Sequence, residues 1–400
     1  MYDAIIVGAR CAGSPTAMLL AQKGFKVLLV DKATFPSDTI STHIIWPPGM
    51  AKLKRWGLLE KVASTNTPLL TKLTFDLGTF ALSGSLPPYE GVTDCYAPRR
   101  TLLDKILVDA ATEAGAEVRE GTAVEEIVMD GDRVTGVRCR GDGGQAATEN
   151  ARIVIGADGR NSLVAKAVNA EKYNVKPSYA CWYYTYWSGV PRDNIEFYMR
   201  PRHAIGYLPT SDGQVCVPIA SPQDEFEQWR ADVEGNYMRL LNEHVPQIAE
   251  RVRAGKREEK FFGLGEVPNF FRKSSGPGWA LVGDAGYHKD PINAQGILDA
   301  FRDAENLADA IDDSFSGGRP LDDALAEYER KRDEHVMPMY EFNSQTASLE
   351  PPPPEAQQLF GALRSNQEQT ERFFGVIAGT VPVPEFFSPE NTQRIVAAAA

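Results

Sequence analysis

The hydrophobic and polar positions at the start of the chain predict a strand, a helix and a second strand. Residues 4–7 are an apolar run rich in β-branched side chains, as expected for a buried strand. A glycine-rich turn over 8–14 leads to a predicted helix that stops at Gly24, and residues 26–30 form a second apolar run that ends at Asp31. Strand, glycine turn, helix, strand and acid, in this order, are typical of a dinucleotide-binding βαβ unit.

The glycine turn carries the chemistry of this unit. Gly8 permits the tight turn, and Gly13 lets the helix pack close to the strand. The N–H groups at the helix start would face a pyrophosphate, and Asp31 stands where a carboxylate accepts hydrogen bonds from a ribose. Arg10 replaces the middle glycine of G-x-G-x-x-G and is expected to add a charge contact to phosphate. The expected nucleotide-binding residues of this motif are Gly8, Ala9, Arg10, Cys11, Ala12, Gly13, Asp31 and Lys32. A coincidental glycine turn in another α/β protein is the alternative, and the motif does not identify the nucleotide.

Regular patterns of the same kind continue to about residue 170. Residues 32–48 form a proline-containing loop, and a loop of this length favours a functional role. Apolar spacing then predicts helices over 49–62 and 101–114, strands within 69–86 and at 117–119 and 152–156, and a hairpin of 124–130 with 133–140.

The composition changes near residue 172, because residues 179–191 are dense in aromatic side chains. Strand-like runs follow, which predict an antiparallel sheet of 195–199, 204–208 and 214–219. Beyond them we expect helices within 223–255, a solvated charged connection at 256–260, a buried strand at 279–282, and helices over 294–311 and 321–341. Residues 351–354 are four prolines that mark a linker, and the remainder is expected to be helical and peripheral.

Charge and cysteine content exclude several classes of protein. The 400 residues are too many for one small core and fit two joined domains. A net charge of −12, without a basic block, argues against nucleic acid or an anionic membrane as partner. The five cysteines are widely spaced and never form C-x-x-C, so neither a disulfide framework nor a metal site is expected. The first strand leaves no room for a signal peptide, and no apolar run approaches about 18 residues. We therefore expect no membrane span and a cytoplasmic location.

Two further motifs follow buried strands. Asp158-Gly159 is an acidic turn after the strand 152–156, and Ser162 can cap the next helix. Gly283-Asp284 ends the strand 279–282, and a loop with Pro291 leads to a helix that begins near Ala294. Asp284 can hold sugar hydroxyls there, and the helix start at Gly296-Ile297 supplies N–H groups and the positive end of a helix dipole.

The three motifs, in this order and at these separations, resemble the FAD-dependent monooxygenases of the para-hydroxybenzoate hydroxylase type. Flavin-dependent halogenases and geranylgeranyl-type reductases are relatives of that family. The resemblance implies that the first motif holds the ADP part of FAD, and that the third holds the ribityl chain and points a helix at the flavin. It adds the following cofactor-binding residues: Arg99 or Arg100, Asp158, Gly159, Gly283, Asp284, Pro291, Ala294, Gly296 and Ile297. Tyr287 stands where many members have histidine, and His288 is shifted by one position.

The resemblance also implies the fold. We expect an α/β protein with a Rossmann-like FAD-binding domain of the glutathione-reductase type, an inserted α+β substrate domain with an antiparallel sheet, and a C-terminal helical segment. The FAD-binding domain would comprise residues 1–70, 98–170 and 270–345. The substrate domain would comprise 71–97 and 171–269, and the helical segment 346–400.

For function, the resemblance implies a single-component monooxygenase that uses NAD(P)H and O2 to hydroxylate or epoxidise an aromatic or polycyclic small molecule through a peroxyflavin. The aromatic stretch is the expected wall of the substrate cavity, and the candidate substrate residues are Tyr183, Thr185, Trp187, Tyr184 and Phe197. The sequence does not decide which face of this strand meets the ligand. His43 is the candidate catalytic residue, as proton relay or substrate contact, with a plain structural histidine as the alternative.

Other functions stay open at this point. A reductase of the geranylgeranyl type would reduce an alkene and bury an isoprenoid chain. A halogenase is disfavoured because the W-x-W-x-I-P element of that branch is missing, and Trp187-Ser188-Gly189-Val190-Pro191 only faintly resembles it. A non-catalytic flavin-binding protein is the alternative from another class.

Overall fold

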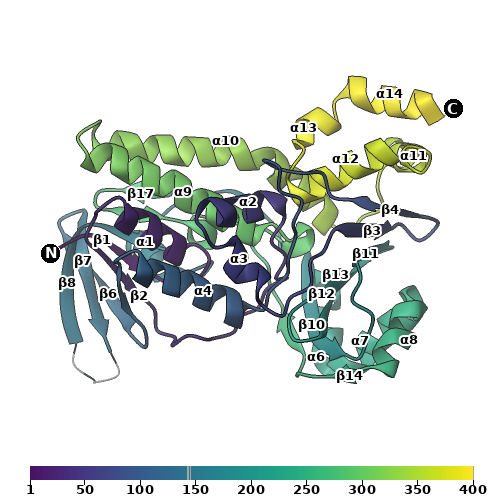
Figure 1. Ribbon diagram of the computed structural model, residues 1–400, viewed down its shortest axis with the longest axis horizontal. Helices are drawn as coiled ribbons and strands as arrows, with labels where there is room; N and C mark the ends of the chain where they lie inside the picture. Colours follow the sequence, from purple (N-terminus) through teal and green to yellow (C-terminus); the bar gives the residue numbers. More distant parts are fainter. Residues whose placement is uncertain (142–143, 145, 400) are drawn as a thin grey trace.

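Two sheet-centred regions and a helical C-terminal segment make up the molecule (Figure 1). The computed structural model describes residues 1–141, 144 and 146–399. In Figure 1 the N-terminal strands lie at one end and the second sheet at the other, while α9 (Gly296–Phe315) and α10 (Leu321–Ala347) run along the first region toward the C-terminal helices. The predicted α/β class is confirmed, and the domain boundaries stay a prediction.

The first sheet is built around the predicted strand–helix–strand unit. Its strand order is β17 (Ser275–Gly276), β18 (Trp279–Leu281), β8 (Ala146–Gly156), β1 (Tyr2–Val7), β2 (Val27–Val30) and β5 (Glu117–Arg119). β1 pairs in parallel with β2 on one side and with β8 on the other. Because parallel strands end at the same edge, the turns after β1, β2, β8 and β18 meet there.

Consecutive residues of β1 point to opposite faces of the first sheet. Ile6 packs in one cluster with side chains of α1 (Gly13–Gln22), α4 (Arg100–Glu113) and α9. Ile5 points the other way, into a cluster with residues of β6 (Ala123–Asp130) and β7 (Arg133–Arg140). β6 and β7 form the predicted hairpin, and β7 also pairs with β8. Burial on both faces explains why β1 and β2 are continuous apolar runs.

The second sheet is largely antiparallel. Its strand order is β14 (Lys256–Arg257), β10 (Ala180–Ser188), β13 (Gln214–Pro222), β12 (His203–Pro209), β11 (Ile195–Arg200), β3 (Lys72–Asp76) and β4 (Ala81–Ser85), with β15 (Phe262–Leu264) also on β10. The three predicted strands are confirmed as β11, β12 and β13. One face is covered by α6 (Phe226–Ala231), α7 (Val233–His244) and α8 (Pro246–Ala254), whose Trp229, Tyr237 and Ile248 pack on β10 and β13.

The C-terminal segment is helical, as predicted, but it is not peripheral. It comprises α11 (Pro354–Leu363), α12 (Gln367–Ala378), α13 (Val383–Phe386) and α14 (Pro389–Ala399). Phe373, Phe374 and Ile377 of α12 are buried in one cluster with Leu73 and Leu82 of the second sheet. The prediction was wrong because the amphipathic face of this segment shows no partner in the sequence, whereas the exposed edge of a sheet needs a cover.

Three further details differ from the expectations. The helix expected over 49–62 is two helices, α2 (Pro47–Arg55) and α3 (Leu59–Ala63), because Gly57 between them has a φ of 73°. The charge run 256–260 is not a free connection, since its first two residues pair with β10 as strand β14. A small third sheet of β19 (Tyr287–His288), β16 (Asn269–Arg272) and β9 (Lys172–Lys176) was not predicted, because its strands are short. Among the described residues, no helix combines the length and apolarity that a membrane crossing requires.

Candidate cofactor and substrate cavity

A cavity of about 660 Å³ lies where the edge of the first sheet meets the second sheet. Its size is within the usual range for cofactor and ligand sites. The predicted residues that line it are Gly8, Arg10, Cys11, Ala12, Asp31, Lys32, Arg100, Asp158, Gly159, Tyr184, Asp284, Pro291, Ala294, Gly296 and Ile297. The predicted residues that do not line it are Ala9, Gly13, His43, Arg99, Tyr183, Thr185, Trp187, Phe197 and Gly283.

The glycine turn is fixed by backbone contacts that leave no room for a side chain. Gly8 has a φ of 103°, and a Cβ placed on it would lie 2.5 Å from the carbonyl oxygen of Ala157. A Cβ on Gly13 would lie 1.8 Å from the carbonyl oxygen of Gly8. Gly13 therefore lies behind the cavity and lets α1 begin close to β1, so that the helix start is directed at the cavity.

Asp31, at the end of β2, is held by backbone N–H groups. Its Oδ2 accepts a hydrogen bond from the N–H of Ala9 at 2.7 Å, and its Oδ1 accepts one from the N–H of Ala33 at 2.8 Å. These bonds fix the carboxylate against the glycine turn and leave lone pairs on both oxygens for ribose hydroxyls.

Two arginines of the cavity share one buried acid, Asp104 of α4. Arg10 contacts Asp104 Oδ2 at 2.6 Å, and Arg100 donates two hydrogen bonds to Oδ1 at 2.8 and 3.0 Å. Asp104 has no exposed surface, whereas the Arg10 side chain is about a quarter exposed. One carboxylate against two guanidinium groups leaves a net positive charge beside the helix start, which suits a pyrophosphate. Sequence reasoning missed Asp104. Its position four residues after Arg100, on the apolar face of α4, nevertheless indicates a buried ion pair between the two residues.

In the second motif, Asp158 and Ser162 accept hydrogen bonds from backbone N–H groups at the start of the next helix. Asp158, after β8, accepts a hydrogen bond from the N–H of Leu163 at 2.5 Å. Ser162 accepts one from the N–H of Ala165 at 2.9 Å, which confirms it as the N-cap of α5 (Leu163–Ala167). Burial raises the pKa of Asp158 above its usual range, and these local hydrogen bonds counteract the rise. Asp158 and Gly159 line the cavity next to the first motif, since β8 and β1 are neighbouring strands.

The third motif leads from β18 to the start of α9. The Asp284 side chain is half exposed and lines the cavity. Ala294 takes a left-handed conformation with a φ of 53°, and the Gln295 side chain donates to the carbonyl of Ile377 in α12 at 2.7 Å. Because a Cβ on Gly296 would meet nothing within 4 Å, the first turn of α9 is open to the cavity.

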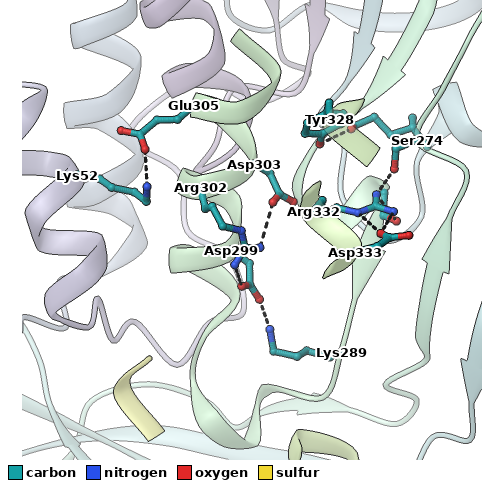
Figure 2. A network of polar contacts seen from close by, with 12 residues as sticks. Lys52, Ser274, Lys289, Asp299, Arg302, Asp303, Glu305, Tyr328, Arg332 and Asp333 are labelled. Atoms are coloured by element: carbon teal, nitrogen blue, oxygen red, sulfur yellow. Dashed lines mark hydrogen bonds and ion pairs between the residues drawn. The ribbon is translucent and has the colours of Figure 1, made fainter. Parts of the chain in front are cut away.

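Behind this helix start lies a buried network of charges (Figure 2). Asp299 forms ion pairs with Lys289 and with Arg302, the latter at 2.8 Å, and Arg302 also contacts Asp303 at 3.0 Å. Burial by itself raises the pKa of Asp299, but Lys289 and Arg302 outweigh burial and hold this pKa below its usual range. Figure 2 shows Lys289 directed at Asp299 from the loop before α9. The network ties that loop to the first turns of the helix.

The second sheet supplies the opposite wall. Trp182 and Tyr184 of β10 line the cavity, together with Leu264 and Val267. The alternate residues Tyr183 and Trp187 point to the other face, where Tyr183 stacks on Trp229 with ring centres 4.5 Å apart. Thr185 also points away from the cavity and donates a hydrogen bond to the carbonyl of Glu259 at 2.8 Å. Of the two faces that the sequence left open, Trp182 and Tyr184 mark the one on the cavity.

Arg99 and His43 lie next to the cavity but do not line it. The Arg99 guanidinium binds Asp38 at 2.5 Å and Glu259 at 2.7 Å, and it lies 3.8 Å from the centre of the Tyr186 ring. His43 Nε2 and the Tyr186 hydroxyl are 2.6 Å apart. Burial, together with the charge of Arg99, lowers the pKa of His43 to about 3. His43 is therefore a buried, neutral histidine that directly follows residues 39–42, which do line the cavity, and its catalytic role stays a prediction.

The residues around the cavity fit FAD. The open first turn of α9 leaves space that a side chain on Gly296 would fill. Arg10 and Arg100 would hold the pyrophosphate, and Asp31 and Asp284 would hold the hydroxyls of the ribose and of the ribityl chain. The start of α9 would face the flavin ring and stabilise negative charge on it.

Known proteins support this assignment. The chain matches the family described as FAD binding domain over residues 1–343. It is 26% identical over 348 residues to the digeranylgeranylglycerophospholipid reductase of Methanosarcina acetivorans, covering 83% of this chain and 80% of that protein. Its fold is similar to that of the flavin-dependent brominase Bmp2, with a TM-score of 0.82, 18% identity, and coverage of 99% and 98%. It is also similar to that of PqsL, a probable FAD-dependent monooxygenase from Pseudomonas aeruginosa, with a TM-score of 0.71, 21% identity, and coverage of 94% and 99%. The chain belongs to the FAD-binding domain family and is an FAD-dependent oxidoreductase.

Proposed function

We propose that this protein is a single-component monooxygenase that uses NAD(P)H and O2 to hydroxylate or epoxidise an aromatic or polycyclic small molecule. The observation that carries the proposal is the wall opposite the start of α9. Trp182 and Tyr184 present rings to the cavity, and Leu264 and Val267 add apolar surface. Such a wall suits a flat substrate and excludes water from it.

The protein's own groups position and stabilise the reacting partners. Arg10 and Arg100 would hold the phosphates at one end of the cavity, and Asp31 would hold a ribose. The N–H groups at the start of α9 would offset negative charge on the flavin ring, in the way an oxyanion site does. When bound, FAD supplies the redox chemistry, which takes electrons from the nicotinamide and passes them to oxygen. The aromatic wall holds the substrate and keeps water away while this happens.

The geranylgeranyl-type reductase is the first alternative, and the relative from Methanosarcina acetivorans belongs to it by name. An isoprenoid chain would need a long apolar tunnel. The apolar pocket that adjoins the cavity on the sheet side has a volume of about 30 Å³, close to the share of one water molecule in the liquid. This pocket does not extend the cavity into such a tunnel, so the lining of the described residues offers no continuous space for an isoprenoid chain on this side.

Halogenases are the second alternative, since the fold is similar to that of a flavin-dependent brominase. The sequence around Trp187 only faintly resembles the W-x-W-x-I-P element of that branch. Trp187 packs with Tyr237 of α7, on the side of the sheet away from the cavity. PqsL, by contrast, has been solved in complex with 2-aminobenzoylacetate, an aromatic compound. These observations favour the monooxygenase.

Anaerobic reduction is the experiment that tests the proposal. The FAD-loaded protein is mixed with NADH or NADPH in the absence of oxygen, with and without each member of a panel of phenolic and polycyclic compounds. Loss of the oxidised-flavin absorbance is followed, and oxygen is then admitted. We expect one compound class to accelerate reduction and to be recovered with an added oxygen atom. Absence of reduction by either nicotinamide would reject the single-component monooxygenase, and saturation of an alkene would favour the reductase.

A further inference from the structure

The sheet side of the cavity continues into the apolar pocket of about 30 Å³. Its walls come from the second sheet, from α10 and from α12. Among the residues that line it, all of which the structure describes, none carries a charge, and the only polar side chains are those of Thr42, Asn293 and Thr346. The pocket and the cavity share five lining residues, namely Thr42, Trp182, Pro218, Pro291 and Ala294. The two spaces therefore meet at Trp182 and Pro291.

One acid stands at this junction. Asp290 precedes Pro291, lines the cavity and is 1% exposed. Its Oδ2 accepts a hydrogen bond from the indole N–H of Trp182 at 3.2 Å, and its Oδ1 accepts one from the N–H of Ile292 at 3.0 Å. Backbone contacts to Asn269 and Asn343 fix its position as well. The carboxyl group is thus held between the loop before α9 and the second sheet.

Asp290 differs from Asp299, the other buried acid that lines the cavity, in having no cation. Asp299 is paired with Lys289 and Arg302, whereas no Lys, Arg or His nitrogen of the described residues lies within 4.0 Å of the Asp290 carboxylate. Burial raises the pKa of Asp290 to about 7, although the bonds from Trp182 and Ile292 act to lower it. Two acceptor bonds leave hydrogen-bonding capacity on both oxygens.

We propose that the substrate is a non-anionic, largely apolar ring compound with one hydroxyl or N–H group, and that Asp290 binds this group where the cavity meets the apolar pocket. This inference rests on the function proposed above and narrows its substrate class. Trp182 and Tyr184 would contact the rings, and the mouth of the uncharged pocket would face the apolar end. An anionic substrate would place its charge in an apolar setting beside a buried carboxyl group that has no counter-ion, which is unfavourable.

Binding of three matched probes tests the inference without turnover. The FAD-loaded enzyme is titrated with 2-naphthol, 2-methylnaphthalene and 2-naphthoate, and the dissociation constant of each is measured from the change in flavin absorbance. We expect 2-naphthol to bind about five- to tenfold more tightly than 2-methylnaphthalene, as one buried hydrogen bond contributes. 2-Naphthoate should bind most weakly. If 2-naphthoate binds as tightly as 2-naphthol, or if the hydroxyl gives no advantage, the inference is overturned.

Two variants assign the hydroxyl advantage to Asp290. Asp290→Leu keeps the size but cannot form the hydrogen bond, so the preference for 2-naphthol over 2-methylnaphthalene should vanish. Trp182→Phe is the control, because it removes the indole N–H but retains Asp290 and should keep the preference. If Asp290 has a purely structural role, Asp290→Leu should weaken the binding of 2-naphthol and of 2-methylnaphthalene equally. That result would contradict the assignment. If Asp290→Leu does not retain FAD, the order of the three probes on the wild-type enzyme decides alone.

These outcomes are separable from those of the oxygenation assay. Probes that bind in the expected order to an enzyme that oxygenates nothing would reject the monooxygenase and leave the Asp290 assignment standing. A working monooxygenase that binds 2-naphthoate most tightly would support the proposed function and reject the Asp290 assignment.

Discussion

The two walls of the cavity are built on different principles. On the side of the first sheet, backbone groups, arginines and acids are arranged by short motifs, each of which spans a strand end and the turn after it. On the side of the second sheet, rings and aliphatic groups come from β10, β13, β15 and the following loop. The first wall suits a cofactor that many proteins share, so its chemistry is local and repeats between proteins. The second wall suits one substrate class, so it depends on how distant segments pack.

Buried charge is treated differently on the two sides as well. Asp104 and Asp299, on the cofactor side, each face two cations. Asp290, at the boundary with the sheet, has hydrogen bonds but no cation. Paired charges fix the geometry of a polar ligand, whereas an uncompensated acid disfavours negative charge beside it. The comparison teaches that ion pairs position Asp104 and Asp299 on the cofactor side, whereas Asp290, at the boundary with the sheet, can discriminate against an anion.

The largest effect is expected from a substitution of Gly13, which lies behind the cofactor side of the cavity. In Gly13→Ala the new Cβ would lie 1.8 Å from the carbonyl oxygen of Gly8, so the helix must move away from the strand. We expect purified protein with almost no FAD and a loss of stability of about 3 kcal/mol or more. The ratio of flavin to protein absorbance and urea unfolding measure both. Gly361→Ala is the matched control: a Cβ there meets nothing within 4 Å, so FAD content should be unchanged.

The second prediction tests whether Asp290 is a buried acid without a counter-ion, through the pH dependence of stability. Because the pKa of Asp290 is raised from 3.8 to about 7 in the folded protein, the native state binds more protons than the unfolded state between these values. Stability therefore falls as pH rises through this window, and Asp290→Asn removes that loss. Asp290→Asn should therefore gain stability relative to wild type as pH rises. The difference in free energy of unfolding, variant minus wild type, should be about 2–3 kcal/mol higher at pH 8 than at pH 5. An equal difference at both pH values would show that Asp290 is not the acid responsible.

A third effect tests the cofactor wall without disturbing the fold. The Asp284 side chain is half exposed, and its nearest ionic contact is His288 at 4.0 Å, so Asp284→Ala should cost little stability. Loss of a charged hydrogen-bond acceptor for the ribityl chain should weaken FAD about ten- to a hundredfold. Reconstitution of the apoprotein with FAD, followed by flavin fluorescence, gives the dissociation constant. Normal FAD affinity in this variant would contradict the role of the third motif.

The difference between the walls also explains what the sequence could predict. Gly8, Asp31, Asp158 and Asp284 could be assigned because each motif places a strand end, a turn and a helix start within a few residues. Local geometry then determines which atoms face a ligand. The expected strands of the second sheet were found for a similar reason, because alternation within one strand is a local property.

Contacts between distant segments could not be predicted. Asp104 forms ion pairs with Arg10, which lies ninety-four positions away, and only the fold brings α4 against the glycine turn. The burial of Ile377, which lines the apolar pocket, depends on how α12 covers the second sheet. His43 contacts the Tyr186 hydroxyl at 2.6 Å across 143 positions of the chain, and its catalytic role stays a prediction. In each case the missing information was the partner, which only tertiary packing supplies.

The smallest expected effect separates two neighbours that the sequence could not distinguish. Tyr183 and Tyr184 are consecutive in β10, and each stacks on one aromatic ring, Trp229 for Tyr183 and Phe262 for Tyr184. Only Tyr184 lines the cavity. Tyr184→Phe removes a hydroxyl at the substrate wall and should change the dissociation constant of 2-naphthol about two- to fivefold. Tyr183→Phe makes the same chemical change on the opposite face and should leave this constant unchanged. A larger change from Tyr183→Phe would mean that the other face of β10 meets the substrate, because consecutive residues of a strand point to opposite faces of the sheet.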